Sequence, residues 1–148
     1  MQTNAILREL SAQTIFLHQA IADHLGLNIT DHKCLDLLHR HGPLTAGHLA
    51  DLSGLTTGAI TGVVDRLEKK GFVRRTSDPS DRRKAVIVVE PGSLSEIEGL
   101  FRTLGERTDA MMRTYSLREQ DVIVDFIEKT SQLVDEFVQE LKKRDPPK

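Results

Sequence analysis

The chain of 148 residues contains few aromatic residues and almost no cysteine. Tryptophan is absent and aromatic residues make up 4% of the sequence, so packing between aliphatic helix faces must supply most of the core. The single cysteine, Cys34, excludes an intrachain disulfide and favours a reducing compartment. No apolar run approaches the roughly 20 residues that span a bilayer, and residues 1–10 lack the basic leader and apolar core of a signal peptide. These absences predict a single-domain protein of the cytoplasm.

The sequence also lacks the motifs of common enzymes. It has no Gly-rich phosphate loop and no nucleophile elbow. Six histidines supply a common metal ligand, yet no pair is spaced i, i+4 on a predicted helix and none follows residue 48. These histidines are His18, His24, His32, His39, His41 and His48. We therefore expect no catalytic residue, no cofactor and no metal site.

Two short helices joined by a tight turn are predicted between residues 45 and 70. Thr45 can cap the first helix, and Leu44 and Leu49 have the spacing of a hydrophobic staple around that cap. The first helix ends at Ser53-Gly54, and Thr56 can cap the second helix. A helix, a turn and a second helix in this order are typical of a DNA-reading unit.

The second of these helices has one apolar face and one face of small or polar side chains. The apolar positions follow the spacing i, i+3, i+4, i+7 and are Ile60, Val63, Val64 and Leu67. The opposite face carries Thr57, Gly58, Thr61, Gly62, Asp65 and Arg66. Small and hydroxyl side chains let a helix backbone approach the floor of the major groove. Because threonine is a poor residue inside a helix, we interpret Thr57 and Thr61 as DNA contacts, with ordinary surface threonines as the alternative.

A basic β-hairpin is predicted directly after this helix. Residues 72–76 and 84–90 have the composition of strands, and residues 77–83 form a long, charged tip. Between Arg66 and Lys84, eight Lys or Arg stand against three acidic residues, a local charge of +5 in a chain whose net charge is −2. A basic segment in an otherwise acidic protein is typical of a surface that binds the nucleic-acid backbone.

Three adjacent cations at the hairpin tip, Arg82, Arg83 and Lys84, give a turn no structural advantage, which favours a role toward DNA. We expect Asp81 to orient Arg83 through an ion pair. Arg66 can be a DNA contact or a solvated charge, whereas Lys69 and Lys70 are interpreted as solvated charges. The complete set of predicted DNA-binding residues is Thr45, Thr56, Thr57, Thr61, Arg66, Arg75, Arg82, Arg83 and Lys84.

Further helices are predicted on both sides of this unit. Residues 4–25 carry a broad apolar stripe, and Thr30 is expected to cap a helix that stops at Gly42-Pro43. After the hairpin, residues 93–96 read as a capping box that opens a helix with coiled-coil spacing of its apolar residues. A second capping box at residues 116–119 opens the last predicted helix.

Cys34 lies next to the apolar positions Leu35 and Leu38 of the predicted second helix. A buried, inert thiol is the expected state of a cysteine in this setting. A redox-sensing cysteine needs an electropositive environment, and the nearby Asp31 and Asp36 oppose one.

The tip sequence Asp78-Pro79-Ser80-Asp81-Arg82-Arg83, preceded by the sequence of residues 67–75, resembles the MarR family of dimeric bacterial transcription regulators. The resemblance covers almost the whole chain, because the family places one helix before this motif and two after it. The chain differs where the hairpin closes, since the family usually has a Leu-Thr pair and this sequence has Val89-Glu90-Pro91.

This resemblance implies a mainly α fold with a small β-hairpin wing, in a single domain of residues 1–148. A winged helix-turn-helix at 30–90 would be flanked by dimerisation helices at 1–27 and 93–143. The expected protein is a homodimeric repressor of a pseudo-palindromic duplex DNA site, with an effector, often an anionic aromatic, near the junction of the two lobes. The alternatives are a monomeric bundle, a winged-helix protein-interaction module without DNA binding, and a redox-sensing regulator that uses Cys34.

Overall fold

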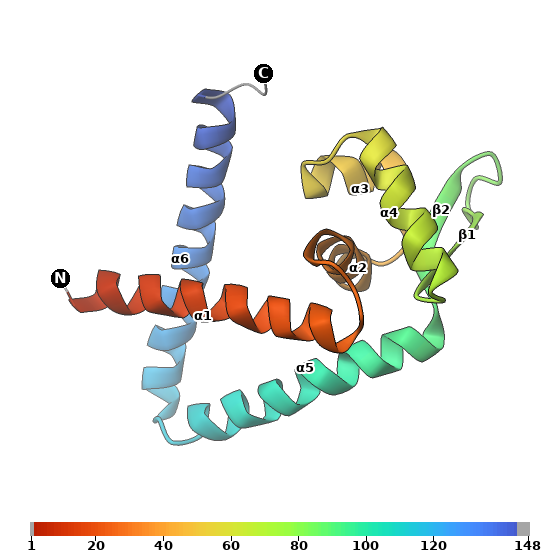
Figure 1. Ribbon diagram of the computed structural model, residues 1–148. Helices are drawn as coiled ribbons and strands as arrows, with labels where there is room; N and C mark the ends of the chain where they lie inside the picture. Colours follow the sequence, from red (N-terminus) through yellow and green to blue (C-terminus); the bar gives the residue numbers. More distant parts are fainter. Residues whose placement is uncertain (1, 145–148) are drawn as a thin grey trace. The chain divides into compact units, whose positions relative to one another are not determined.

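The computed structural model describes residues 2–144 and contains six helices and one two-stranded antiparallel sheet in that range (Figure 1). The elements follow in the order α1 (Gln2–His24), α2 (Ile29–His41), α3 (Ala46–Ser53), α4 (Thr57–Lys69), β1 (Val73–Ser77), β2 (Ala85–Val89), α5 (Pro91–Met112) and α6 (Leu117–Arg144). This mainly α architecture with a hairpin wing confirms the predicted fold class. None of the helices in the described range is long and apolar enough to cross a membrane.

The chain forms two compact units, and the boundary between them lies inside α5, after Phe101. The first unit contains α1 through β2 and the start of α5, and the second contains the rest of α5 and α6. The buried cluster of the first unit contains aliphatic residues from each of its elements, and Leu35, Leu49, Ile60 and Leu67 are among its most fully buried members. Aliphatic packing therefore provides this core, as the shortage of aromatic residues predicted.

The two helices of the predicted DNA-reading unit have the expected caps. The Thr45 hydroxyl oxygen accepts the amide of His48 at 3.2 Å, and the Thr56 hydroxyl oxygen accepts the amide of Ala59 at 3.2 Å. Gly54 follows α3 in the left-handed region with φ of 74°, which a residue with a Cβ rarely adopts. Each prediction rested on contacts within a few residues and is confirmed.

The helix α2 begins earlier than the sequence pattern predicted. Asn28 is its cap, with a side-chain oxygen that accepts the Asp31 amide at 2.8 Å, so the predicted cap at Thr30 was wrong. Asn28 has extended backbone geometry, as a cap requires, and it follows Leu27, which is buried in the core. Thr30 consequently lies in the first turn of the helix. The predicted stop at Gly42 is confirmed, since its amide donates to the carbonyl of Leu38 at 3.0 Å.

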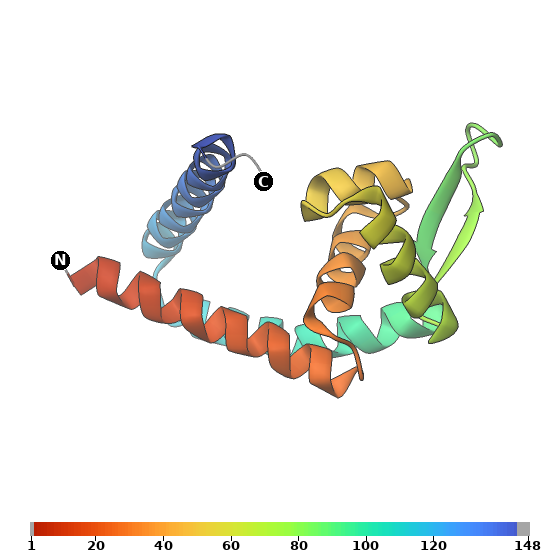
Figure 2. The same cartoon turned by 45° about the horizontal axis from the view of Figure 1, so that its top comes forward.

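The hairpin pairs Val73 with Val89 and Ser77 with Ala85. Its first strand is shifted by one residue from the predicted position, and its second strand is one residue shorter than predicted at each end. Leu44 forms an isolated bridge with Ile87, and the two residues exchange backbone hydrogen bonds of 3.2 and 2.8 Å. In both views of the ribbon the hairpin extends from the end of α4, and its tip points away from the helices of the first unit (Figures 1 and 2).

The helix α5 begins at Pro91, where the Leu94 amide donates to the Glu90 carbonyl at 2.9 Å. Proline is favoured at the first position of a helix because its missing N–H has no partner there anyway. The predicted capping box at residues 93–96 was therefore wrong, and the Ser93 hydroxyl donates instead to the carbonyl of Gly71 at 3.1 Å. The shift reflects tertiary contact, because Gly71 lies 22 residues earlier in the sequence.

The capping box that opens α6 is confirmed. The Ser116 amide donates to Glu119 Oε2 at 2.8 Å, and the Glu119 amide donates to the Ser116 hydroxyl oxygen at 3.4 Å. Hydrogen bonds from the hydroxyl and the amide of Ser116 lower the pKa of Glu119. The box is complete within four residues, which is why the sequence alone predicted it.

Candidate nucleic-acid interface

The helix α4 has one buried and one exposed face, as its periodicity predicted. Ile60, Val63, Val64 and Leu67 are all buried, whereas Thr57, Gly58, Thr61 and Asp65 are exposed. The Thr61 hydroxyl donates to the carbonyl of Thr57 at 3.1 Å, and its oxygen can still accept a hydrogen bond from a base edge. The exposed face of α4 therefore carries small side chains, most of which are polar.

One flank of this face is held by an ion pair that the sequence did not predict. Arg66 donates through Nε to Asp31 Oδ2 at 2.9 Å and through Nη2 to Asp31 Oδ1 at 2.7 Å. The Asp31 carboxylate is almost fully buried, while half of the Arg66 side chain is exposed. The hydrogen bonds to Asp31 raise the pKa of Arg66. Arg66 is therefore a paired residue rather than the solvated charge that the sequence left as an alternative.

The other flank of α4 is held by Arg75, which extends from β1. Its amide donates to Glu68 Oε1 at 3.0 Å, and its guanidinium contacts the carboxylates of Glu68 and Asp65. The hydrogen bonds that Arg75 donates to Asp65, and to a smaller extent those to Glu68, raise the pKa of Arg75. Because both partners lie on α4, Arg75 joins the hairpin to α4, and two carboxylates offset its charge.

The tip of the hairpin is organised by two aspartates. Asp78 accepts the amide and the hydroxyl of Ser80, both at 2.7 Å, and these bonds lower the pKa of Asp78. Asp81 accepts the backbone amide of Arg83 at 3.1 Å, and its other oxygen lies 4.0 Å from Lys84 Nζ. The predicted ion pair between Asp81 and the Arg83 side chain was therefore wrong. Asp81 fixes the main chain at Arg83, and the Arg83 guanidinium has no acidic partner among residues 2–144.

The basic segment 66–84 contains both paired and unpaired cations. Arg74 lies 3.3 Å from Glu90, and Lys70 donates to the Gly26 carbonyl. Arg66, Arg75 and Lys84 have the acidic partners described above. Within the range 2–144, Lys69, Arg82 and Arg83 are exposed and have no acidic partner. Two of these three cations are neighbours at the wing tip, which is therefore the part of this segment with the most positive charge available to a ligand.

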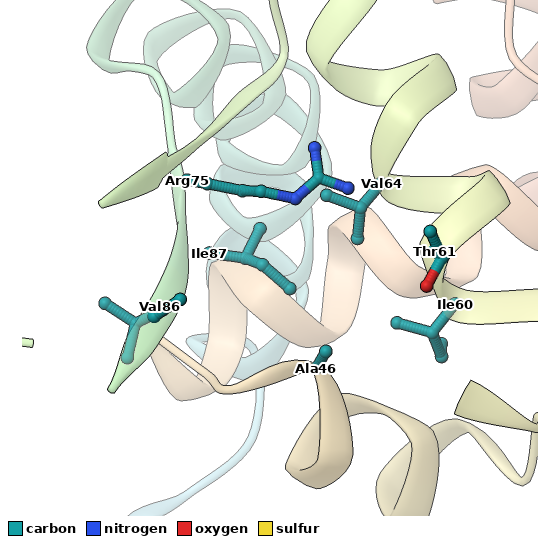
Figure 3. Close-up of a pocket in the computed structure, with 8 residues that line it drawn as sticks. Ala46, Ile60, Thr61, Val64, Arg75, Val86 and Ile87 are labelled. Atoms are coloured by element: carbon teal, nitrogen blue, oxygen red, sulfur yellow. The ribbon is translucent and has the colours of Figure 1, made fainter. Parts of the chain in front are cut away.

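A pocket of about 170 Å³ lies between α4 and the hairpin. Figure 3 shows Ile60, Thr61 and Val64 on the α4 side, Val86 and Ile87 on the β2 side, and Arg75 extending toward Val64. The walls of this pocket are mostly aliphatic, and the Arg75 guanidinium that lines it already has two carboxylate partners. This pocket offers little uncompensated charge to an anionic ligand.

A larger pocket, of about 340 Å³, lies between α1 and α2. Its lining combines apolar and ionisable side chains, which are Thr14, Ile15, His18, Ile29, His32, Lys33, Asp36 and Arg40. Lys33 donates to the carbonyl of Ser53 at 2.8 Å, at the turn that joins α3 to α4. The sequence predicted no ligand-binding residue, because the pocket combines side chains of two helices whose packing no local pattern indicates.

Cys34 is buried, and burial raises the pKa of its thiol. This agrees with the expected inert thiol and disfavours the thiolate that a redox sensor requires. Within the described part of the chain, no three His, Cys, Asp or Glu side chains gather as a metal site.

A capped helix-turn-helix, an exposed polar recognition face and a cationic hairpin define a winged helix-turn-helix protein. A family model described as MarR family matches residues 27–85. The chain is 44% identical over 137 residues to the HTH-type transcriptional regulator YcgE of Bacillus subtilis (strain 168), and the match covers 93% of this chain and 89% of that protein. The chain belongs to the MarR family, and it is a DNA-binding transcriptional regulator and not an enzyme.

A second relative and two solved structures agree with this assignment. The HTH-type transcriptional repressor YetL of the same organism is 33% identical over 104 residues, which cover 67% of this chain and 60% of that protein. A MarR family protein from Bacillus stearothermophilus has a TM-score of 0.67 at 23% identity, with coverage of 93% of this chain and 94% of that one. A MepR mutant from a multidrug resistant S. aureus clinical isolate has a TM-score of 0.69 at 16% identity, with coverage of 90% and 98%. At these identities the two structures show the shared fold.

Proposed function

We propose that the protein is a homodimeric, ligand-responsive repressor that places α4 in the major groove of a pseudo-palindromic site. The exposed, small and polar face of α4 carries this proposal, because it lets the helix backbone approach base edges. A structure of an S. aureus MepR mutant bound to an oligodeoxyribonucleotide has the same fold, with a TM-score of 0.60 and coverage of 90% of this chain. The relatives YetL and NicR are named as repressors, which supports the direction of regulation.

Within this proposal the predicted DNA residues have distinct tasks. Thr57 and Thr61 face base edges, and the caps Thr45 and Thr56 bring helix N-termini toward phosphates. The exposed cations Arg82, Arg83 and Lys84 extend to the flanking minor grooves. Arg75 contributes mainly by holding the wing against α4. A duplex selected from a random-sequence library should bind more tightly at low salt than at high salt, and a chain that binds no duplex at either would favour a protein-interaction module.

Exposed apolar side chains on α6 support the dimer. Val134, Phe137 and Leu141 recur at helical spacing, and more than half of the Phe137 side chain is exposed. A second copy of the chain would remove this apolar surface from water. Phe137→Asp should shift the chain toward the monomer in analytical ultracentrifugation, whereas Gln139→Asp, on the polar side of the same helix, should leave the dimer intact. Equal behaviour of the two variants would favour the monomeric bundle.

The pocket between α1 and α2 is the proposed effector site. Ile15 and Ile29 provide apolar walls for an aromatic ring, and Lys33, which donates to a backbone carbonyl, provides a cation for a carboxylate, whereas the charge of Arg40 is offset by Asp36. An anion that draws Lys33 away from the Ser53 carbonyl would release a tether on the turn between α3 and α4. Binding would then shift the population away from the DNA-competent arrangement.

Benzoate is a simple anionic aromatic with which to test this site. Calorimetry should detect benzoate binding to the wild-type chain, and saturating benzoate should lower its affinity for a selected duplex. Lys33→Ala should lose both effects, whereas Lys129→Ala, which removes an exposed cation of α6, should keep them. Retention of both effects in Lys33→Ala would place the effector elsewhere.

A further inference from the structure

Asp31 and Arg66 join α2 to the recognition helix across 35 residues of sequence. Both oxygens of the Asp31 carboxylate accept hydrogen bonds from one guanidinium, at 2.9 and 2.7 Å. Asp31 is 1% exposed, so its carboxylate is taken out of water and depends on this partner. A buried carboxylate with both oxygens bound by the same guanidinium holds that guanidinium in one orientation.

The pairing leaves one edge of the Arg66 guanidinium unused. Nε and Nη2 bind Asp31, and Nη1 lies beside α4, 3.3 Å from where a Cβ of residue 62 would stand. Because residue 62 is glycine, the guanidinium can lie close against the helix at this point. Half of the side chain remains exposed. Arg66 is thus held by Asp31 through Nε and Nη2, and Nη1 has no hydrogen-bond partner within residues 2–144.

This geometry is suited to a phosphate oxygen. A guanidinium has five donors in a planar fork, so it can bind a carboxylate with one edge and a phosphate with another. A long cation that is already ordered loses less conformational entropy on binding than a free one. Arg66 also lies at the edge of the exposed face that carries Thr61 and Gly62. If α4 enters the major groove, this edge of the face lies beside the DNA backbone.

We propose that Asp31 is a positioning residue for DNA binding, which holds Arg66 so that its free Nη1 edge donates to a phosphate beside the recognition helix. This inference rests on the proposed placement of α4 in the major groove. Asp31 itself does not touch DNA and acts through Arg66. Under this proposal, removal of the Asp31 charge weakens DNA binding. By electrostatics alone, removal of a negative charge near DNA would strengthen binding, so the direction of the change distinguishes the two explanations.

The test measures binding of a fluorescent duplex, selected from a random-sequence library by the wild-type chain, across a salt series. Asp31→Asn should weaken binding at about 0.1 M salt by roughly tenfold, the loss that one phosphate contact carries in this range. Arg66→Ala should weaken binding similarly and reduce the slope of log K against log salt by about one ion. Asp125→Asn is the control, because it removes the same charge from an aspartate that also has a cation partner, Lys129, and it lies on α6 outside the proposed sites. This control should bind at least as tightly as the wild type.

A double-mutant cycle separates positioning from independent effects. In the Arg66→Ala background, Asp31→Asn should cause no further loss of affinity, because the residue through which it acts is gone. If Asp31→Asn alone melts below the assay temperature, Asp31→Asn with Arg66→Gln supplies a neutral hydrogen-bonding pair. That variant should fold and still show the reduced salt slope.

Wild-type affinity in Asp31→Asn, or an unchanged salt slope in Arg66→Ala, would overturn this inference while leaving DNA binding itself in place. A wild-type chain that binds no duplex would instead overturn the proposed function. Additive losses in the double variant would show that Asp31 does not act through Arg66. Each result therefore bears on one of the two proposals separately.

Discussion

His18 and His32 form a hydrogen bond of 3.1 Å between Nδ1 of the first ring and Nε2 of the second, and this bond joins α1 to α2. The His32 ring is buried, and within the described residues its Nδ1 has no hydrogen-bond partner. Burial, followed by the charge of His18, lowers the pKa of His32 below its ordinary value of 6.5, although Asp36 opposes the shift. His32 therefore stays neutral in the folded chain at a pH where an exposed histidine takes up a proton.

This lowered pKa makes stability depend on pH. Below about pH 6.5 the unfolded chain binds a proton at His32 that the folded chain does not bind, so the free energy of unfolding falls as the pH decreases. The melting temperature of the wild type should fall more between about pH 7.5 and pH 5.5 than that of His32→Gln. The exposed His48→Gln variant should follow the wild type. Parallel curves for the wild type and His32→Gln would contradict the assignment of this effect to His32.

Arg83→Ala tests the contact of the wing with DNA. Because the Arg83 side chain is exposed and without an acidic partner in the described range, its loss should weaken specific and scrambled duplexes by similar factors. The slope of log K against log salt should decrease by about one ion. Lys129→Ala, which removes a cation from α6, should leave the slope unchanged. If Arg83→Ala keeps the wild-type affinity and slope on both duplexes, the wing does not touch DNA.

Thr61→Ala tests the reading of base edges by α4. Loss of the exposed hydroxyl should reduce the preference for a selected duplex over a scrambled one by about 1 kcal/mol, the weak end for a single base contact. The salt slope should stay the same, because no charge is removed. Thr108→Ala is a suitable control, since Thr108 makes the same hydrogen bond to the carbonyl four residues earlier, at 3.0 Å. An unchanged preference in Thr61→Ala would mean that Thr61 is an ordinary surface threonine.

Cys34→Ser tests the redox alternative. Because the thiol is buried and its pKa is raised by burial, peroxide should not release the wild type from DNA, and the serine variant should behave in the same way. The measurement is duplex affinity before and after treatment with peroxide. Release of the wild type alone would identify Cys34 as a redox sensor.

Local patterns in the sequence predicted most of the elements correctly. Caps at Thr45 and Thr56 and the capping box of Ser116 and Glu119 depend on hydrogen bonds that span three residues, so a short stretch of sequence contains both partners. The same holds for the apolar face of α4, because helical periodicity places its members together before any tertiary contact forms.

The two errors at helix starts arose where the sequence offers more than one position at which the helix can begin. Asn28 and Thr30 are both competent caps, and the start of α2 follows the residue next to the buried Leu27. Ser93 has the sequence of a cap, but its hydroxyl is bound to Gly71. For both helices, the local sequence allows more than one starting residue at similar energy, and contact with the core or with a distant turn selects one of them.

The sequence by itself determined the class of fold, the order of its elements and the segment in which positive charge is concentrated. Only the tertiary structure decided which of those charges are free. Arg66 is paired with Asp31, 35 residues away, and Arg75 is paired with Asp65, 10 residues away, whereas Arg83 has no acidic partner in the described part of the chain. Helical periodicity and caps act between near neighbours and can be read along the chain, but an ion pair depends on which helices pack together, and that is settled by burial of the whole core.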